Sequence, residues 1–321
     1  MAFVAIPAAA DDAKPIAVEK KQNTHRVLID GKLFTELIHG ATDQFGDIPR
    51  PFLYPIIGPT GAQMTRNFPM RKDVKGEASD HPHHRSLWFT HGNVNGTDFW
   101  HRAKATIQVV DTNLHTNFAN TKNPIVTTVE SWRSADNKEQ LHAWAIHRFH
   151  IYDDGSRIID IHRYHQVGAD AEQVVFGDTK EGTMAIRLAP QLRLKGEVAT
   201  GKAINSEGDK DTKVWGKRAK WVAYWGQIDG KTCGVAIFDH PSNLRHPTWW
   251  HARDYGLVAA NPFGMSDFEK GKHKRGDGDY TLKQDETLSL RYRFVFFAGT
   301  AEEADIAGKY DEWVKETTEA E

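Results

Sequence analysis

Three Asp-Gly pairs, each between two strand-like runs, constrain the fold of this chain more than any other feature. Asp-Gly supplies the positive backbone φ that a tight turn between antiparallel strands requires. The flanking runs are Thr24–Asp30 with Lys32–Ile38, Leu141–Tyr152 with Ser156–Gln166, and Trp221–Ile228 with Thr232–Asp239. Three such hairpins predict an all-β protein built from a large antiparallel β-sandwich.

The end of the chain predicts one further strand and one helix. Leu288–Phe297 is an apolar run of strand length, and Thr300 with Glu303 has the spacing of a capping box at the start of a helix. Beyond it, Ile306, Tyr310, Trp313 and Val314 repeat at helical spacing. We expect this C-terminal α-helix to pack across a sheet or to cover a sheet edge.

The chain is expected to form one domain. It has 321 residues, and no Pro-rich or Ser/Gly-rich tract divides it. The predicted domain spans residues 23–321, after a disordered tail or signal-peptide remnant at residues 1–22. The first ten residues, MAFVAIPAAA, are similar to the end of an export signal, which favours a periplasmic or secreted protein over a cytoplasmic one.

Composition excludes several classes of partner. The net charge is −2, so the chain lacks the basic excess of a protein that binds nucleic acid or a membrane surface. No segment approaches the roughly 18–20 apolar residues of a membrane helix. Cys233, the one cysteine, lies in an apolar run and is expected to be a buried small hydrophobe. A small molecule or oligosaccharide is the expected partner, and the oligomeric state stays open.

Four segments are unusually rich in ionisable and turn-forming residues. They are DHPHHRSLWFTHGNVNG at residues 80–96, FGDTKEG at 176–182, NSEG at 205–208 with WGKR at 215–218, and the long run from Phe238 to Gly264. Asp-His-Pro occurs in the first and the last of them. Binding and catalytic groups concentrate on such loops, so we expect the four segments to meet at one pocket.

Side-chain chemistry assigns a role to each candidate in these segments. Imidazole and carboxylate groups carry protons near neutral pH, so His81, His83, His84, Glu181 and His251 are the predicted acids and bases. Gly177 and Gly182 permit a tight backbone that directs Glu181 inward. The remaining candidates can bind a polar substrate, and they are Arg85, Trp88, Asp178, Lys180, Arg218, Asp239, His240, Arg245, Arg253, Asp254 and Tyr255.

A metal site is the alternative for the histidine run, because neutral imidazole is the commonest metal ligand. However, the chain has no HExxH or CxxC motif. In an extended segment, His84 would point away from His81 and His83. Nearby cations such as Arg85, Lys180 and Arg253 would also oppose a dication. We therefore expect no metal and no cofactor.

These segments resemble the PmoA-like domains of unknown function, a family labelled "methane oxygenase PmoA". The matching pieces are RPFLYP at residues 50–55, DHPHHRSLWF, HGNVNGTDFW, FGDTKEG, NSEG, WGKRAKW and FDHPSNLRHPTWWHARDYGLVAANPFG. The resemblance implies a β-supersandwich similar to galactose mutarotase, and an association with polysaccharide breakdown. The methane label itself does not suit a chain without membrane helices.

The leading hypothesis is therefore a carbohydrate-active enzyme, a hydrolase, lyase or epimerase that uses histidine and carboxylate groups as acid and base. Two alternatives stay open. A non-catalytic sugar-binding protein would keep the tryptophan and arginine contacts without an acid–base pair. A metal-dependent oxygenase or oxidase would follow the label and use the histidine run.

Overall fold

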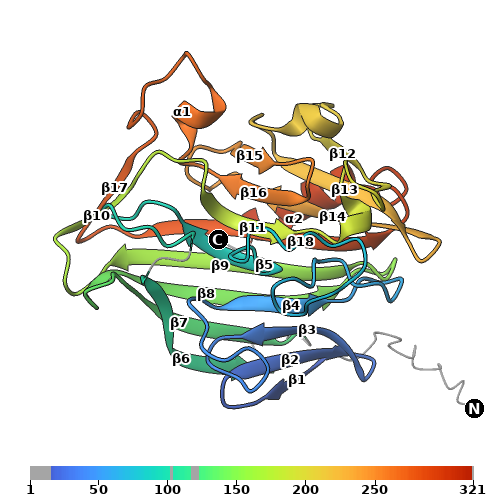
Figure 1. Ribbon diagram of the computed structural model, residues 1–321, viewed down its shortest axis with the longest axis horizontal. Helices are drawn as coiled ribbons and strands as arrows, with labels where there is room; N and C mark the ends of the chain where they lie inside the picture. The colour runs from blue at the N-terminus through green and yellow to red at the C-terminus, as the bar shows by residue number, and fades with distance from the viewer. Residues whose placement is uncertain (1–15, 102–103, 117–122, 320–321) are drawn as a thin grey trace, which may run out of the picture.

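Antiparallel strands are the dominant regular structure in the computed structural model, which describes residues 16–101, 104–116 and 123–319 (Figure 1). The first large sheet contains, in spatial order, β1 (Ile16–Lys20), β2 (Thr24–Ile29), β3 (Lys32–Ile38), β4 (Phe52–Ile56), β5 (Leu87–His91), β11 (Gly182–Arg187), β16 (Leu257–Asn261) and β15 (Trp249–Ala252). The second contains β12 (Lys202–Asn205), β13 (Trp221–Ile228), β14 (Lys231–Asp239), β18 (Leu288–Ala298), β9 (Arg157–Val167), β8 (Glu139–Ile151), β7 (Ile125–Arg133) and β6 (Thr106–His115).

Shorter elements complete the described fold. Strands β10 (Gln173–Phe176) and β17 (Tyr280–Lys283) form a two-stranded sheet, and α1 (Met265–Phe268) is a single helical turn. Two 3₁₀ turns, η1 (Pro190–Leu192) and η2 (Asp211–Val214), lie in the loops, and α2 (Ile306–Thr318) follows β18. The predicted all-β sandwich with a C-terminal helix is confirmed.

All three hairpins form where the Asp-Gly pairs predict them. Strands β2 and β3 turn at Asp30 and Gly31, whose φ angles are 52° and 69°, and β13 and β14 turn in the same way at Asp229 and Gly230. Strands β8 and β9 are joined by a longer turn in which Gly155 has φ 82°.

The N-terminal boundary differs from the expected one. Strand β1 lies within residues 1–22, where a tail was expected, and pairs with β2 from Ile16↔Ile29 to Lys20↔His25. Ile16 and Val18 pack against the core, which explains why this edge strand forms. The export-signal prediction falls on residues 1–10, outside the described residues.

The inner faces of the two large sheets form the main core. Residues alternate along β8, so that every second residue from Leu141 to Phe149 is buried while the residues between them are half-buried or exposed. Met184 and Ile186 of β11 join the same core from the other sheet. Cys233 is also buried there, as expected.

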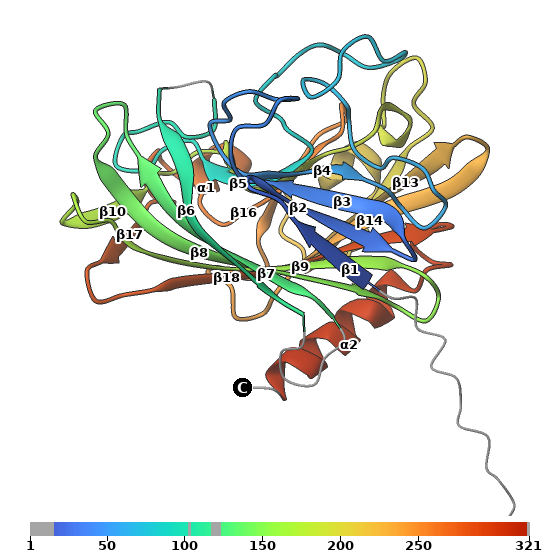
Figure 2. The same ribbon diagram turned by 90° about the horizontal axis from the view of Figure 1, so that it is seen from below.

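Helix α2 covers the outer face of the second sheet (Figure 2). Ile306, Tyr310 and Trp313 pack against residues of β13, β14 and β18, such as Phe238 and Val295. Thr300 and Glu303 exchange the two hydrogen bonds of a capping box, but the helix itself begins after Asp305, which caps it through Gly308. None of the helices in the described part of the chain has the length and apolar character needed to span a membrane.

The outer face of the first sheet is covered by loops instead. Every residue of β5, β11, β15 and β16 is buried, so both faces of these strands are packed. The long connections rise over this face, on the side of the molecule opposite α2 (Figure 2). Most of the ionisable segments of the sequence belong to these connections.

Candidate functional site

A row of side chains crosses the outer face of the first sheet and forms the base of the candidate site. The strand register places Trp88 of β5, Ala185 of β11, Ala259 of β16 and His251 of β15 beside one another. Two small alanines thus separate two large rings. Side chains alternate along a strand, so residues two positions apart share a face. Arg187, two residues after Ala185 on β11, and Arg253, two residues after His251 and just beyond β15, therefore lie on this same face.

Asp80 joins the first loop to this face. Its carboxylate accepts hydrogen bonds from Arg66 (2.6 Å) and Arg187 (3.1 Å), and it lies 2.8 Å from Nδ1 of His81. Burial alone would raise the pKa of Asp80, but Arg187, His81 and Arg66 outweigh it and lower that pKa. Burial also lowers the pKa of Arg187, to about 9, so both arginines stay charged at neutral pH.

Four aromatic rings stack from the surface down to the sheet. Tyr255 and His81 lie 5.5 Å apart, His81 and His84 4.9 Å, and His84 and Trp88 5.3 Å, with planes tilted by 10°, 10° and 22°. His81 is 42% exposed, whereas Trp88 is buried. Arg187 donates to Nδ1 of His84 at 3.0 Å, so the remaining proton of this neutral ring is on Nε2.

The three histidines of the first segment do not converge on one point. The His83 ring stands at 77° to His84 and approaches His101 at 4.8 Å. Burial lowers the pKa of His83 to about 3, and it holds the pKa of His84 far below its usual range. Among the described residues, no three His, Cys, Asp or Glu side chains are grouped so as to hold a metal ion. The expectation that no metal is needed stays a prediction.

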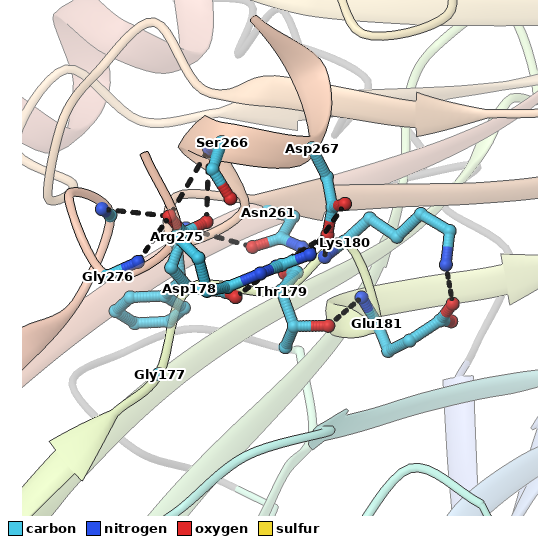
Figure 3. Close-up of polar contacts among 12 residues, drawn as sticks. Gly177, Asp178, Thr179, Lys180, Glu181, Asn261, Ser266, Asp267, Arg275 and Gly276 are labelled. Atoms are coloured by element: carbon cyan, nitrogen blue, oxygen red, sulfur yellow. Dashed lines mark hydrogen bonds and ion pairs between the residues drawn. The ribbon is translucent and has the colours of Figure 1, made fainter. Parts of the chain in front are cut away.

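Asp178 anchors the segment that carries Glu181 (Figure 3). Its buried carboxylate accepts hydrogen bonds from the backbone N–H groups of Ser266 (3.1 Å), Gly276 (3.2 Å) and Gly278 (3.2 Å). The structure thus gives Asp178 a structural contact set rather than the substrate contact expected from the sequence. Asp267 also contributes by accepting from the Lys180 backbone N–H at 2.8 Å.

The two glycines around Glu181 allow close approach to β5 and its loop. A Cβ atom on Gly177 would lie 2.1 Å from the Asn93 side chain, and one on Gly182 would lie 2.5 Å from Nδ1 of His91. Neither glycine has a positive φ. Their role is therefore to make room, and the Glu181 side chain, 20% exposed, forms an ion pair with Lys180.

His251 is held in one tautomer beside this ion pair. Its Nδ1 lies 2.9 Å from the Lys180 carbonyl oxygen, which can only accept, so Nδ1 carries the proton. Burial lowers the pKa of His251 to about 4; Glu181 opposes this shift, while Lys180 and Arg253 add to it. The ring is thus neutral at pH 7 with a lone pair on Nε2, which has no hydrogen-bond partner among the described residues.

Arg253 and Tyr255 complete the half-buried part of the site. The Arg253 guanidinium lies over Tyr255 (5.4 Å to the ring centroid) and near Trp215 (5.9 Å). Burial raises the pKa of Tyr255, against the opposing effects of Arg187 and Arg253, so the phenol keeps its proton. We call the whole set the outer-face cluster, and it comprises Asp80, His81, His84, Lys180, Glu181, Arg187, His251, Arg253 and Tyr255.

Several predicted site residues lie outside this cluster. Arg218 and Arg245 hold loops together by donating to backbone carbonyls, Arg218 to Pro247 and Arg245 to Gly278. Asp239 is buried at the end of β14, where it accepts from Asn243 and the Thr248 N–H and contacts His246. These contacts stabilise the fold, and a substrate-binding role for the three residues stays a prediction.

His240, Arg85 and Asp254 also have other surroundings. His240 contacts Trp313 and Thr317 of α2, on the opposite side of the molecule. Arg85 lies over the Phe52 ring. Asp254 follows Arg253 in the chain, and its charge helps to raise the pKa of the buried Tyr224. Whether the outer-face cluster acts as one site, as the sequence predicts, stays a prediction.

Sequence reasoning missed Arg66 and Arg187, the two cations that bind Asp80. Arg187 carries the one charge in the strand GTMAIR, and a single charge inside an apolar run is a usable signal. Arg66 has no comparable signal, because only the folded chain brings it to residues 80–84. Ala185 and Ala259 were missed for the same reason.

A comparison with curated proteins found no match. Among solved structures, a GalM/aldose epimerase homologue from C. elegans is 10% identical, with a TM-score of 0.29 over 89% of this chain and 99% of that one. An Aspergillus nidulans amine oxidase is 10% identical, with a TM-score of 0.22 over 88% of this chain and 50% of that one. These likenesses are too weak to bear on function, and no comparison supports a methane-oxygenase label. A model of a family of unknown function, DUF6807, matches residues 24–311, and the chain therefore belongs to that family.

Proposed function

We propose that this protein is a carbohydrate-active enzyme that works by acid–base catalysis at the outer-face cluster. In this proposal, Nε2 of His251 removes a proton from the substrate, and Glu181 is the second acid–base group. The observation that carries the proposal is the tautomer of His251, whose lone pair has no hydrogen-bond partner in the described part of the chain and whose pKa is influenced by the charge of Glu181.

Two properties of His251 support its role as a base. A general base must be neutral and must have a free lone pair within reach of substrate. Burial keeps the ring neutral, and the hydrogen bond to the Lys180 carbonyl fixes which nitrogen is available. Asp178 and Asn261, which hold residues 178–180 in place, keep that carbonyl in position.

A sugar suits the mixture of groups around this base. Sugar rings offer apolar C–H faces and a rim of hydroxyl groups, and binding sites for such molecules combine aromatic rings with a few polar groups. Tyr255 and Trp215 are half-buried aromatic rings next to Arg253, and Tyr255 is close enough to Glu181 for the carboxylate to influence its pKa. A hydrolase, a lyase and an epimerase all need an acid–base pair of this kind, so the reaction type is left to experiment.

One contact favours the alternative of a non-catalytic binding protein. Lys180 binds a carboxylate oxygen of Glu181, as it would in an ion pair that only stabilises the loop. A metal-dependent oxidase has less support, because His81, His83 and His84 pack against one another instead of facing one point.

The test is a screen of the purified protein against a panel of oligosaccharides, including unsaturated and 3-keto sugars, followed by two substitutions. Loss of a general acid or base typically costs about 10²–10⁴-fold in rate. We therefore expect Glu181→Gln and His251→Asn each to lower kcat at least about 100-fold, with far-UV circular dichroism unchanged. Asn is chosen because its amide can still donate to the Lys180 carbonyl.

Glu172→Gln is the matched control, because Glu172 is exposed between β9 and β10 and its side chain makes no hydrogen bond or ion pair with the described residues. It should leave kcat unchanged. If a sugar binds but no product forms under any condition, the protein is a binding protein. Turnover by Glu181→Gln at nearly the native rate would return Glu181 to a structural role.

A further inference from the structure

Arg253 is a charged side chain whose hydrogen-bond donors are unused. Its guanidinium lies 5.4 Å from the centroid of the Tyr255 ring and 5.9 Å from that of the Trp215 ring, and the residue is half-buried. Within the described residues it makes no ion pair and no side-chain hydrogen bond, and the neighbouring Asp254 does not pair with it. A guanidinium has five N–H donors, so a half-buried one without an acceptor is poised to bind one.

Three other buried or half-buried arginines on this side of the molecule are already engaged. Arg66 and Arg187 share the Asp80 carboxylate. Arg193 donates to the carbonyl oxygens of Pro190 and Gly76. Each of these guanidinium groups thus has an acceptor. Arg253 differs because its neighbours are aromatic rings, which hold the cation in place without using its N–H groups.

The charges of the outer-face cluster also leave a positive excess. Its cations are Arg187, Arg253 and Lys180, and its carboxylates are Asp80 and Glu181, so the five groups sum to +1. Outside the cluster, Arg66 on Asp80 adds one positive charge and Asp254, which follows Arg253 in the chain, adds one negative charge, so the sum stays +1. The histidines with resolved shifts, His84 and His251, are neutral at pH 7. An anionic ligand would offset this excess.

Resting on the function proposed above, we propose that the substrate is an acidic sugar, such as a uronic acid, whose carboxylate is bound by Arg253. The planar guanidinium matches a carboxylate with two parallel hydrogen bonds. The rings of Tyr255 and Trp215 orient the guanidinium before the ligand arrives, which lowers the entropic cost of binding.

The position of Arg253 suits this role. His251 leaves the same face of the strand two residues earlier, and two residues of extended strand span roughly 6.5 Å. A carboxylate bound to Arg253 therefore brings the attached sugar ring over Nε2 of His251. Arg253 lowers the pKa of His251 and Glu181 raises it, which agrees with the closeness of the three groups.

The experiment measures dissociation constants by ligand-observed NMR for matched acidic and neutral sugars. The pairs are D-glucuronate with D-glucose, D-galacturonate with D-galactose, and D-mannuronate with D-mannose, and succinate serves as a carboxylate without a sugar ring. The proteins are the native chain, Arg253→Gln, Arg253→Lys and the control Arg71→Gln. Arg71 is an exposed arginine in the loop between β4 and β5, and its side chain makes no hydrogen bond or ion pair within the described residues.

We expect at least one acidic sugar to bind more tightly than its neutral partner. Arg253→Gln should weaken that binding about 10- to 100-fold, the effect of losing hydrogen bonds to a charged group. It should change the affinity for the neutral sugar less than about threefold. Arg253→Lys should restore part of the lost affinity, because lysine keeps the charge but not the paired geometry. Arg71→Gln should have no effect.

The outcomes separate the two proposals. Equal affinity for acidic and neutral sugars, unchanged in Arg253→Gln, overturns the acidic-sugar proposal and leaves the carbohydrate function standing. Binding of succinate but of no sugar, lost in Arg253→Gln, supports the carboxylate site and overturns the carbohydrate function. If no ligand binds the native chain, both proposals fail.

Discussion

Replacing Asp178 by asparagine distinguishes a structural role for this residue from substrate binding. The carboxylate accepts hydrogen bonds from three backbone N–H groups, those of Ser266, Gly276 and Gly278. Asparagine keeps one oxygen and turns an NH₂ group toward these donors, so at least one buried N–H loses its acceptor. Each unsatisfied group costs about 1–3 kcal/mol, and we expect a total loss in unfolding free energy of about 2–4 kcal/mol.

Urea denaturation followed by tryptophan fluorescence measures this loss, with Asp277→Asn as the matched control. Asp277 lies in the same loop, but its side chain is 46% exposed. The control should lose less than about 1 kcal/mol. Asp178→Asn should also lower kcat, because the segment that orients His251 is loosened. Native stability combined with a raised KM would refute the structural interpretation and return Asp178 to the substrate site.

Two further predictions concern the surroundings of Glu181 and the buried histidines. Gly182→Ala should lower the free energy of unfolding by about 1–3 kcal/mol and should also lower kcat, because the added Cβ would lie 2.5 Å from the His91 ring. Unchanged stability in thermal denaturation would contradict this prediction. His91 and His147 are buried, and burial lowers their pKa values to about 4 and about 3, so the unfolded chain binds more protons than the folded one below pH 6.5. The unfolding free energy should therefore be fully retained above about pH 6.5. It should fall toward pH 4, by up to about 1.4 kcal/mol per pH unit for each histidine. An unfolding free energy that stays constant in urea titrations between pH 7 and pH 5 would count against this prediction.

Local sequence was sufficient for the three hairpins, the strand Leu288–Ala298 and the C-terminal helix. The Asp-Gly turns work because only a few residue types accept positive φ, and the chain has them between alternating apolar runs. The apolar face of α2 was equally visible, with Ile306, Tyr310 and Trp313 buried together. These signals act between near neighbours in the chain. Strand β1 was missed because its five residues lie at an edge and carry little apolar pattern.

The sequence identified the residue types of the candidate site, but it did not show which of these residues lie close together in the fold. Polar-rich segments marked His81, Glu181, His251 and Arg253, which the fold brings to one face of the first sheet. The same signal also marked Asp178, Arg245 and Asp239, whose contacts turned out to stabilise loops. A carboxylate that binds substrate and one that binds backbone N–H groups look alike in a sequence, because both favour glycine-rich turns.

What the sequence determined by itself is therefore the antiparallel architecture, its hairpins and its C-terminal helix, since turn geometry and side-chain periodicity are local properties. Tertiary structure alone decided which loops cover the first sheet and that Arg66 and Arg187 share Asp80. It also left the Arg253 side chain without an acceptor among the residues that the structure describes. It also fixed the tautomer of His251 through the carbonyl of Lys180, 71 residues away in the chain. These features depend on the distance between atoms that only folding brings together, and charge pairing and desolvation both follow from that distance.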